Sequence, residues 1–181
     1  MLGIDEIRRI LESLGARYAL IGAHAMAARG YPRSTVDVDF LTTDQRVLEP
    51  GIWADVARAG GTVESRRGDH DDPLAGVVHI LLADGSDVDV VVGRWKWEAA
   101  LIDRAERMRV ADIEIPVART SDLIMLKLAA GGYLDQRDAA ALLATGNRAD
   151  LVREVEANID DVRPDIRPAW RELLALTGDD S

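Results

Sequence analysis

The chain has 181 residues, with 22 lysines and arginines against 32 aspartates and glutamates, a formal net charge of −10 at pH 7 and no cysteine. This length fits one domain, or one domain with a helical extension, and is enough for a sizeable core. The missing cysteines exclude a structural disulfide, a cysteine-rich zinc site and a cysteine nucleophile, and they favour a reducing, cytoplasmic setting. The excess of acidic residues argues against broad, sequence-independent binding to a phosphate backbone, but it does not exclude a local basic patch. No apolar run reaches the 18 residues of a membrane helix, so no membrane partner is expected.

The first half of the chain mixes helix and strand patterns. Helices are predicted over 4–14, where apolar residues recur at three- and four-residue steps before Gly15, and over 23–29 and 52–59. Strands are predicted over 18–22, 36–41, 62–66, 77–83 and 87–92, the last two joined at Asp84-Gly85-Ser86 as a hairpin.

After Gly93 the pattern changes. A helix over 96–107 and a strand near 113–117 lead to helices only, over about 120–131, 135–144, 148–159 and 168–177. The sequence therefore predicts an α/β protein. Its core, 1–118, would be a small mixed β-sheet with flanking helices, followed by a C-terminal helical region, 119–181, that packs on this core.

Two pairs of carboxylates carry the strongest chemical signal. Asp37 and Asp39 stand two apart in one predicted strand, and Asp87 and Asp89 repeat that spacing in another. Each pair therefore shares one face of its strand, although a half-exposed strand with a solvated face has the same pattern. If the two strands are neighbours, three or four carboxylates converge, and such clusters hold the two Mg²⁺ ions that phosphoryl and nucleotidyl transfer use.

Other features precede the first carboxylate pair. Gly22 and Ala23 end a strand and open a helix, a junction where free backbone N–H groups can hold a phosphate. Arg33, Ser34 and Thr35 follow, just ahead of the carboxylates. A strand, a small-residue turn, a helix, an Arg-Ser-Thr segment and a two-carboxylate strand thus form one ordered constellation.

These residues resemble a known family. The segment YALIGAHAMAARGYPRSTVDVDF, 18–40, resembles the opening signature of the nucleotidyltransferase superfamily typified by DNA polymerase β, in its minimal bacterial form. The segment SDLIMLKLAAGGYLDQRDAAALL, 121–143, resembles the remaining motifs of the AbiEii-like group, which includes the toxins of type IV toxin–antitoxin systems. The likeness covers about 18–143.

The resemblance implies the nucleotidyltransferase fold and a Mg²⁺-dependent enzyme that transfers a nucleoside monophosphate from an NTP to an acceptor hydroxyl. In the matching positions, Asp37 and Asp39 would bridge two Mg²⁺ ions. Asp89 would bind the catalytic ion and assist deprotonation of the acceptor, with Asp87 on the same face as the alternative third carboxylate. The residues implied to hold the triphosphate are Gly22, Ala23, Arg33, Ser34 and Lys127.

The sequence departs from the family pattern at three positions. Ala23 stands where the family has a second Gly or Ser, which removes a hydroxyl but leaves the backbone N–H. Gly132 and Leu134 replace the Arg and Lys of the last motif, of which Asp135 and Asp138 remain. Catalysis would survive these changes with altered handling of the substrate.

The sequence does not identify the acceptor. The resemblance implies a toxin that acts on RNA, at tRNA ends, with a cognate antitoxin protein as partner. A small-molecule (antibiotic) nucleotidyltransferase and a catalytically silent binding protein of the same fold are the alternatives. The local basic cluster that an RNA acceptor would need comprises Arg94, Lys96, Arg104, Arg107 and Arg109. Trp95 or Trp97 would stack a base, unless the tryptophans pack the following helix onto the sheet.

Overall fold

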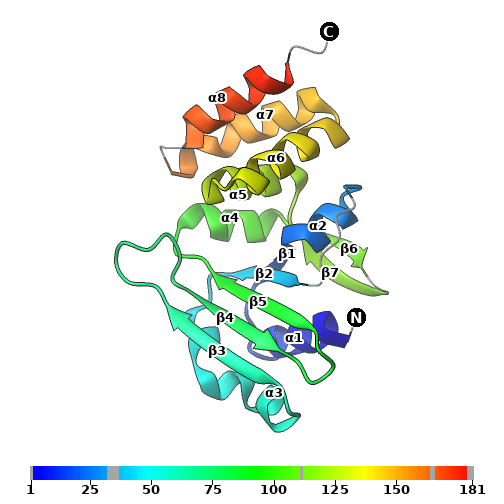
Figure 1. The fold of residues 1–181 in the computed structure, drawn as a ribbon, viewed down its shortest axis with the longest axis vertical. Helices are drawn as coiled ribbons and strands as arrows, with labels where there is room; N and C mark the ends of the chain where they lie inside the picture. Colours follow the sequence, from blue (N-terminus) through cyan, green and yellow to red (C-terminus); the bar gives the residue numbers. More distant parts are fainter. Residues whose placement is uncertain (1, 32–36, 111, 164–165, 179–181) are drawn as a thin grey trace. The chain divides into compact units, whose positions relative to one another are not determined.

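The computed structural model describes residues 2–31, 37–110, 112–163 and 166–178 (Figure 1). The chain divides into two compact units: unit 1 comprises residues 1–28 and 32–118, and unit 2 comprises residues 29–31 and 119–181. Each unit has its own set of buried apolar side chains. Within the described ranges, no helix combines the length and the apolar character needed to cross a membrane.

The described part of unit 1 is built on a seven-stranded sheet in the order β3-β4-β5-β2-β1-β7-β6. The strands are β1 (Tyr18–Ile21), β2 (Val38–Thr42), β3 (Thr62–Arg67), β4 (Gly76–Leu81), β5 (Asp87–Val92), β6 (Glu106–Val110) and β7 (Ile113–Val117). β2 runs parallel to β5 and β1 parallel to β7, while the other neighbours are antiparallel. The predicted α/β class with a mixed sheet and flanking helices is confirmed.

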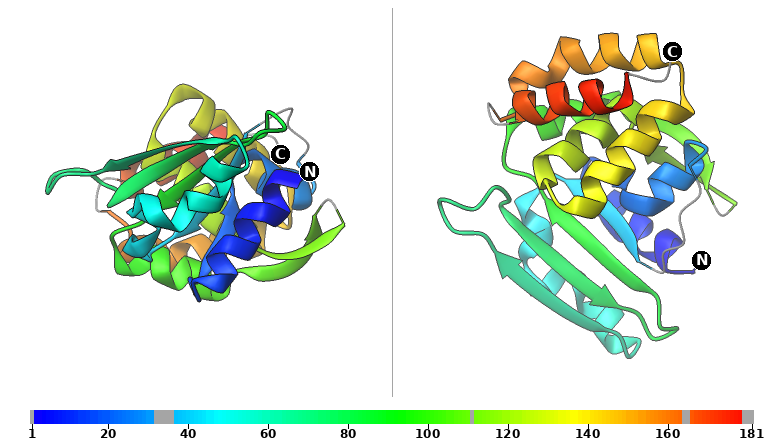
Figure 2. Two further views of the ribbon diagram at one scale, coloured as in Figure 1. Left: turned by 90° about the horizontal axis from the view of Figure 1, so that it is seen from below. Right: turned by 45° about the horizontal axis from the view of Figure 1, so that its top comes forward.

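The alternation of apolar and polar residues gives the central strands one buried face. Phe40 on β2, Val90 on β5 and Ile80 on β4 are fully buried on that face. The helices α1 (Leu2–Ser13) and α3 (Ala54–Arg58) lie on one side of strands β3 to β5 (Figure 2). Two short 3-10 turns, η1 (Gln45–Leu48) and η2 (Pro50–Trp53), precede α3, so the helix predicted over 52–59 is shorter than expected.

The region after β5 differs from the prediction. The helix α4 (Lys96–Arg104) is shorter than the predicted 96–107, and its last predicted turn belongs to β6, which pairs antiparallel with β7. β6 is an edge strand in which Arg107 and Arg109 alternate with Met108 and Val110. Charged residues are a common means of protecting an edge strand from further pairing. They also hide its strand pattern in the sequence, which is why the strand was missed.

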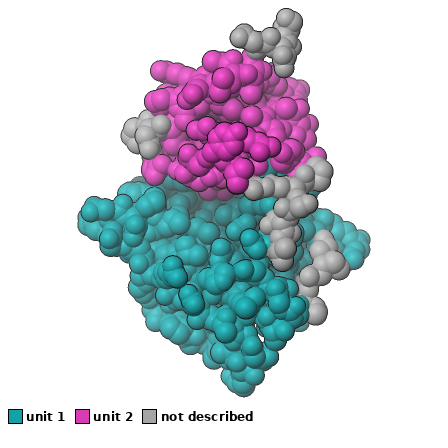
Figure 3. Space-filling view, viewed as in Figure 1, with its two compact units in different colours: residues 1–28, 32–118 teal, residues 29–31, 119–181 magenta. Residues whose placement is uncertain are grey.

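Unit 2, which is magenta in Figure 3, is helical in all of its described secondary structure. It contains α5 (Thr120–Ala130), α6 (Tyr133–Thr145), α7 (Arg148–Asn158), the 3-10 turn η3 (Ile159–Asp161) and α8 (Ile166–Thr177). Gly131 ends α5 with φ +73°, and its N–H donates to the carbonyl of Lys127. The Asn147 side chain caps the start of α7. The predicted succession of helices is therefore present.

Candidate active site

Asp39 and Asp89 are direct neighbours across two parallel strands. β2 and β5 pair with Asp39 opposite Asp89, at the spacing of about 4.8 Å that separates paired strands. Both side chains lie on the sheet face opposite the buried Phe40 and Val90. The condition set by the sequence, that the two carboxylate strands be neighbours, is met, and the register singles out Asp89 as the partner of Asp39.

Asp39 also lies against the end of β1. Its partner on that strand is Ile21, and the next residue, Gly22, has φ +64° and begins α2 (Gly22–Ala28). A Cβ added to Gly22 would lie 2.7 Å from the carboxyl carbon of Asp39 and closer still to its Oδ2. Only glycine adopts this φ readily and also leaves room for the carboxylate. Ala23, the next residue of the predicted phosphate-holding turn, is buried.

Asp37 lies just before β2 and is exposed. Its backbone oxygen lies 3.0 Å from Nδ1 of His24, which α2 supplies. The imidazole of His24 thus fixes the main chain beside Asp37. Arg33 and Ser34, expected to hold the triphosphate, and Thr35 lie outside the described residues.

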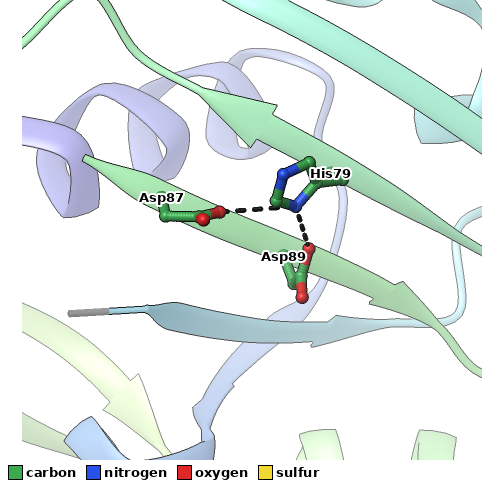
Figure 4. A group of neighbouring side chains, drawn as sticks. All are labelled: His79, Asp87 and Asp89. Atoms are coloured by element: carbon green, nitrogen blue, oxygen red, sulfur yellow. Dashed lines mark hydrogen bonds and ion pairs between the residues drawn. The ribbon is translucent and has the colours of Figure 1, made fainter. Parts of the chain in front are cut away.

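A histidine joins the two carboxylates of β5. His79 on β4 stands directly opposite Asp89, and its Nδ1 lies 2.9 Å from Oδ1 of Asp89 and 3.3 Å from Oδ1 of Asp87 (Figure 4). The hydrogen bond to Asp89, helped by the charge of Asp87, raises the pKa of His79 above its ordinary value. Potential ligand atoms of these three residues lie within 4.8 Å of one another.

Sequence reasoning missed His79, although the predicted hairpin contained a signal for it. His79 and Asp89 are equidistant in sequence from Asp84, at the centre of the turn between β4 and β5. A tight, symmetric hairpin places such residues opposite each other. The symmetric register of that turn is the sequence signal that places His79 opposite Asp89.

A cavity of about 640 Å³ adjoins Asp89 and His79 within unit 1. Its wall includes Glu64 and Arg66 of β3 and the loop between β3 and β4, with Pro73 among its apolar lining residues. This volume lies in the range of about 300–1,000 Å³ that is typical of small-molecule sites. A small molecule in the cavity would therefore lie beside the Asp89 carboxylate.

Arg94, expected to contact RNA, instead supports a wall of this cavity. Its guanidinium donates to the carbonyls of Asp69, His70 and Leu74 at 2.6, 3.1 and 3.0 Å, and the indole of Trp95 donates to the carbonyl of Pro73. Trp97 is buried, as expected if it packs α4 onto the sheet. The rest of the predicted basic cluster is partly neutralised, because Arg109 pairs with Asp112 and Arg107 lies 3.9 Å from the Glu114 carboxylate.

Replacing Arg94 with Ala should therefore loosen the loop over 68–75. We expect its backbone amides to exchange hydrogen at least about tenfold faster, because three carbonyl contacts worth roughly 1 kcal/mol each are lost. Hydrogen–deuterium exchange with mass spectrometry measures this. Lys96→Ala is the matched control, since Lys96 is an exposed basic residue of the same segment. Equal exchange rates in both variants would show that Arg94 does not hold the loop.

Lys127 lies in unit 2 between two carboxylates of α6. Its Nζ is 2.8 Å from Oδ1 of Asp135 and 3.1 Å from Oδ2 of Asp138, and Asp138 is buried. The family resemblance implies that Lys127 holds the triphosphate, and Asp135 and Asp138 are the residues that remain of the last family motif. Asp135 serves as the N-cap partner as well, because its Oδ2 accepts the N–H of Gly132.

Lys127→Ala should destabilise unit 2, because it leaves the buried Asp138 without this cation. Removing one partner of a fully buried pair costs about 3–5 kcal/mol, and the partial exposure here reduces the expected loss to about 1–3 kcal/mol. Urea unfolding measures the change. Asp135→Asn, at the more exposed partner, should cost less. Unchanged stability of Lys127→Ala would show that the ion pairs contribute nothing to the fold.

Comparison with known proteins identifies structures with a similar fold. No protein-family model and no curated protein matches the sequence. The solution structure of the antibiotic-resistance factor ANT(2'')-Ia is similar at a TM-score of 0.56 and 17% identity, covering 96% of this chain and 91% of that one. The crystal structure of ANT(2'')-Ia in complex with adenylyl-2''-tobramycin gives 0.57 at 15% identity, with coverages of 88% and 97%. The lincomycin-bound lincosamide antibiotic adenylyltransferase LnuA gives 0.51 at 10% identity, with coverages of 79% and 96%.

The chain has the nucleotidyltransferase fold. Within this fold, the donor set formed by Asp39 and Asp89 fits a hard divalent cation, because carboxylate oxygens on neighbouring strands can share one ion. The missing Cβ of Gly22 leaves the space that the Asp39 carboxylate occupies. The carboxylate donor set suits Mg²⁺, which takes a few carboxylates and completes its shell with water and phosphate oxygens.

Proposed function

We propose that this protein is a Mg²⁺-dependent nucleotidyltransferase. The observation that carries the proposal is the pairing of Asp39 with Asp89 across parallel strands of the nucleotidyltransferase fold. Asp37, Asp39 and Asp89 would hold two Mg²⁺ ions, which when bound neutralise phosphate charge and favour a nucleophilic acceptor oxygen. The family resemblance of the sequence supports the same assignment.

In the proposed reaction an acceptor hydroxyl oxygen attacks the α-phosphorus of an NTP. The new bond joins the acceptor oxygen to the α-phosphorus, and the bond from that phosphorus to the bridging oxygen breaks. Pyrophosphate leaves with the electron pair, and the hydroxyl proton passes to the Asp89 carboxylate, which acts as general base. The residues proposed to hold the triphosphate, in line with the family motifs, are Gly22, Ala23, Arg33, Ser34 and Lys127.

For the acceptor, the cavity favours a small hydroxyl-bearing molecule. It adjoins the Asp89 carboxylate and has the volume of a small-molecule site. Similar folds occur in a protein crystallised with adenylyl-2''-tobramycin and in one with bound lincomycin. An RNA acceptor would use the basic cluster of the sequence, in which Arg94 contacts loop carbonyls and Arg109 pairs with an acidic side chain.

The AbiEii-like motifs of the sequence support the toxin hypothesis. It implies transfer to tRNA ends and a cognate antitoxin protein. Induced expression of the wild-type chain in a bacterial host would then stop growth, whereas expression of Asp39→Asn would not. Equal growth with both chains would contradict the toxin hypothesis and leave the small-molecule acceptor as the proposal.

A direct experiment separates the acceptors. The protein is incubated with each α-³²P-labelled NTP and Mg²⁺, together with either total tRNA or a panel of aminoglycosides and lincosamides. Label on an antibiotic supports the small-molecule proposal, and label on tRNA supports the toxin hypothesis. If no acceptor is labelled and no pyrophosphate is released while NTP still binds, the protein is a catalytically silent member of the fold and the proposed activity is wrong.

A further inference from the structure

The imidazole of His79 has a defined place relative to the proposed catalytic carboxylate. Antiparallel pairing of β4 with β5 sets His79 directly opposite Asp89, and parallel pairing of β5 with β2 sets Asp89 opposite Asp39. The three side chains therefore form a row across three neighbouring strands, on one face of the sheet. This row is fixed by backbone pairing.

His79 contacts one of the two carboxylate oxygens of Asp89. Its Nδ1 lies 2.9 Å from Oδ1, while the second oxygen points away from the imidazole, on the side where β2 lies (Figure 4). A single N–H donor on one oxygen fixes the rotation of a carboxylate about its last side-chain bond. The free oxygen of Asp89 is thereby held toward the strand that carries Asp39.

The charges around Asp89 explain why it needs such a donor. Asp87 lies on the same face of β5, and its Oδ1 is 3.3 Å from the same nitrogen. Glu64 of β3 stands opposite His79 on its other side. Because carboxylates of like charge repel one another, the donor between Asp87 and Asp89 offsets this repulsion and keeps Asp89 in one orientation.

We propose that His79 is a positioning residue, whose Nδ1–H holds the Asp89 carboxylate in the orientation that a shared cation with Asp39 requires. The inference rests on the proposed function for its catalytic consequence, but the hydrogen bond itself does not depend on that function. His79 contacts neither acceptor nor nucleotide in this proposal, and acts only through Asp89. Hydrogen-bond partners of ligating residues typically change metal affinity or activity by about 10–100-fold when they are removed.

Two substitutions separate this role from a structural one. His79→Leu removes the donor, whereas His79→Asn keeps an amide N–H close to the position of Nδ1. Mn²⁺, a paramagnetic stand-in for Mg²⁺, is titrated into each variant and the free ion is measured by electron paramagnetic resonance. We expect His79→Leu to bind Mn²⁺ about tenfold more weakly and His79→Asn to stay near the wild type.

The same variants are assayed for nucleotidyl transfer. His79→Leu should lower kcat by about tenfold or more with little change in the KM for NTP, and His79→Asn should restore most of the rate. Leu81→Asn, at an exposed position of the same strand and face, should change neither quantity and controls for asparagine in β4. Equal losses in His79→Leu and His79→Asn, or no loss in either, would overturn the proposal.

Nuclear magnetic resonance keeps this test independent of the proposed function. A long-range ¹H–¹⁵N spectrum of the metal-free protein reports which ring nitrogens of His79 carry hydrogen. A hydrogen on Nδ1 that is lost or weakened in Asp89→Asn supports the proposal. A bare Nδ1 overturns it, whether or not the protein transfers nucleotides. The protein could show no transfer while Nδ1 carries hydrogen and His79→Leu binds Mn²⁺ more weakly than the wild type. That result would count against the proposed function alone.

Discussion

Asp39→Asn is expected to lower the rate of nucleotidyl transfer by at least roughly 10²–10³-fold while the protein stays folded. Asn is nearly isosteric with Asp, so the approach to Gly22 is preserved, but the charge that Asp39 contributes beside Asp89 is lost. Single-turnover assays with labelled NTP measure the rate, and circular dichroism confirms the fold. A near-wild-type rate would contradict a mechanism based on carboxylate-held cations.

Matched variants on β5 sharpen this prediction. Asp89→Asn should reduce the rate as strongly as Asp39→Asn, and the double variant should be little worse than either, because residues that act as one unit are not additive. Asp87→Asn should be milder, since Asp87 stands opposite Leu81 and not in the row with Asp39. If Asp89→Asn keeps its transfer rate and Asp87→Asn loses it, Asp87 and not Asp89 is the third carboxylate.

Gly22→Ala is expected to damage both the fold and the activity. The new Cβ would lie 2.7 Å from the carboxyl carbon of Asp39, and alanine is strained at φ +64°. Strain and overpacking together should cost about 2–5 kcal/mol of the free energy of unfolding. Displacement of Asp39 should lower the transfer rate by about 10²-fold, because small misplacements of reacting groups have effects of that size.

Gly15→Ala is the control that separates the two causes. Gly15 has nearly the same backbone angle, φ +68°, but a Cβ there would meet nothing within 4 Å. Its substitution should therefore cost only the strain, about 1–2 kcal/mol, with an unchanged transfer rate. Urea unfolding and the same transfer assay test both variants. Equal effects at the two glycines would show that the close approach of Asp39 to Gly22 is unimportant.

The strands and the hairpin that support the site were predictable from local patterns. β2 and β5 carry buried residues such as Phe40 and Val90 on one face and the carboxylates Asp39 and Asp89 on the other, and the turn at Asp84 joins β4 to β5. Gly22 and Asp39 could be named from the sequence because their motif is local. The strand β6 could not be found in this way, because its charged residues conceal an edge strand whose apolar partner is β7.

The sequence by itself determined the fold class and named the candidate carboxylates and the candidate glycine turn, because these depend on residue type and short-range spacing. Tertiary structure decided which carboxylate stands opposite Asp39, since the register of β2 with β5 depends on long-range pairing. It also placed His79 beside Asp89, committed Arg94 to loop carbonyls and surrounded Lys127 with carboxylates. Each of these contacts joins residues from separate elements, and the chemistry of a charged side chain depends on the partners that folding brings to it.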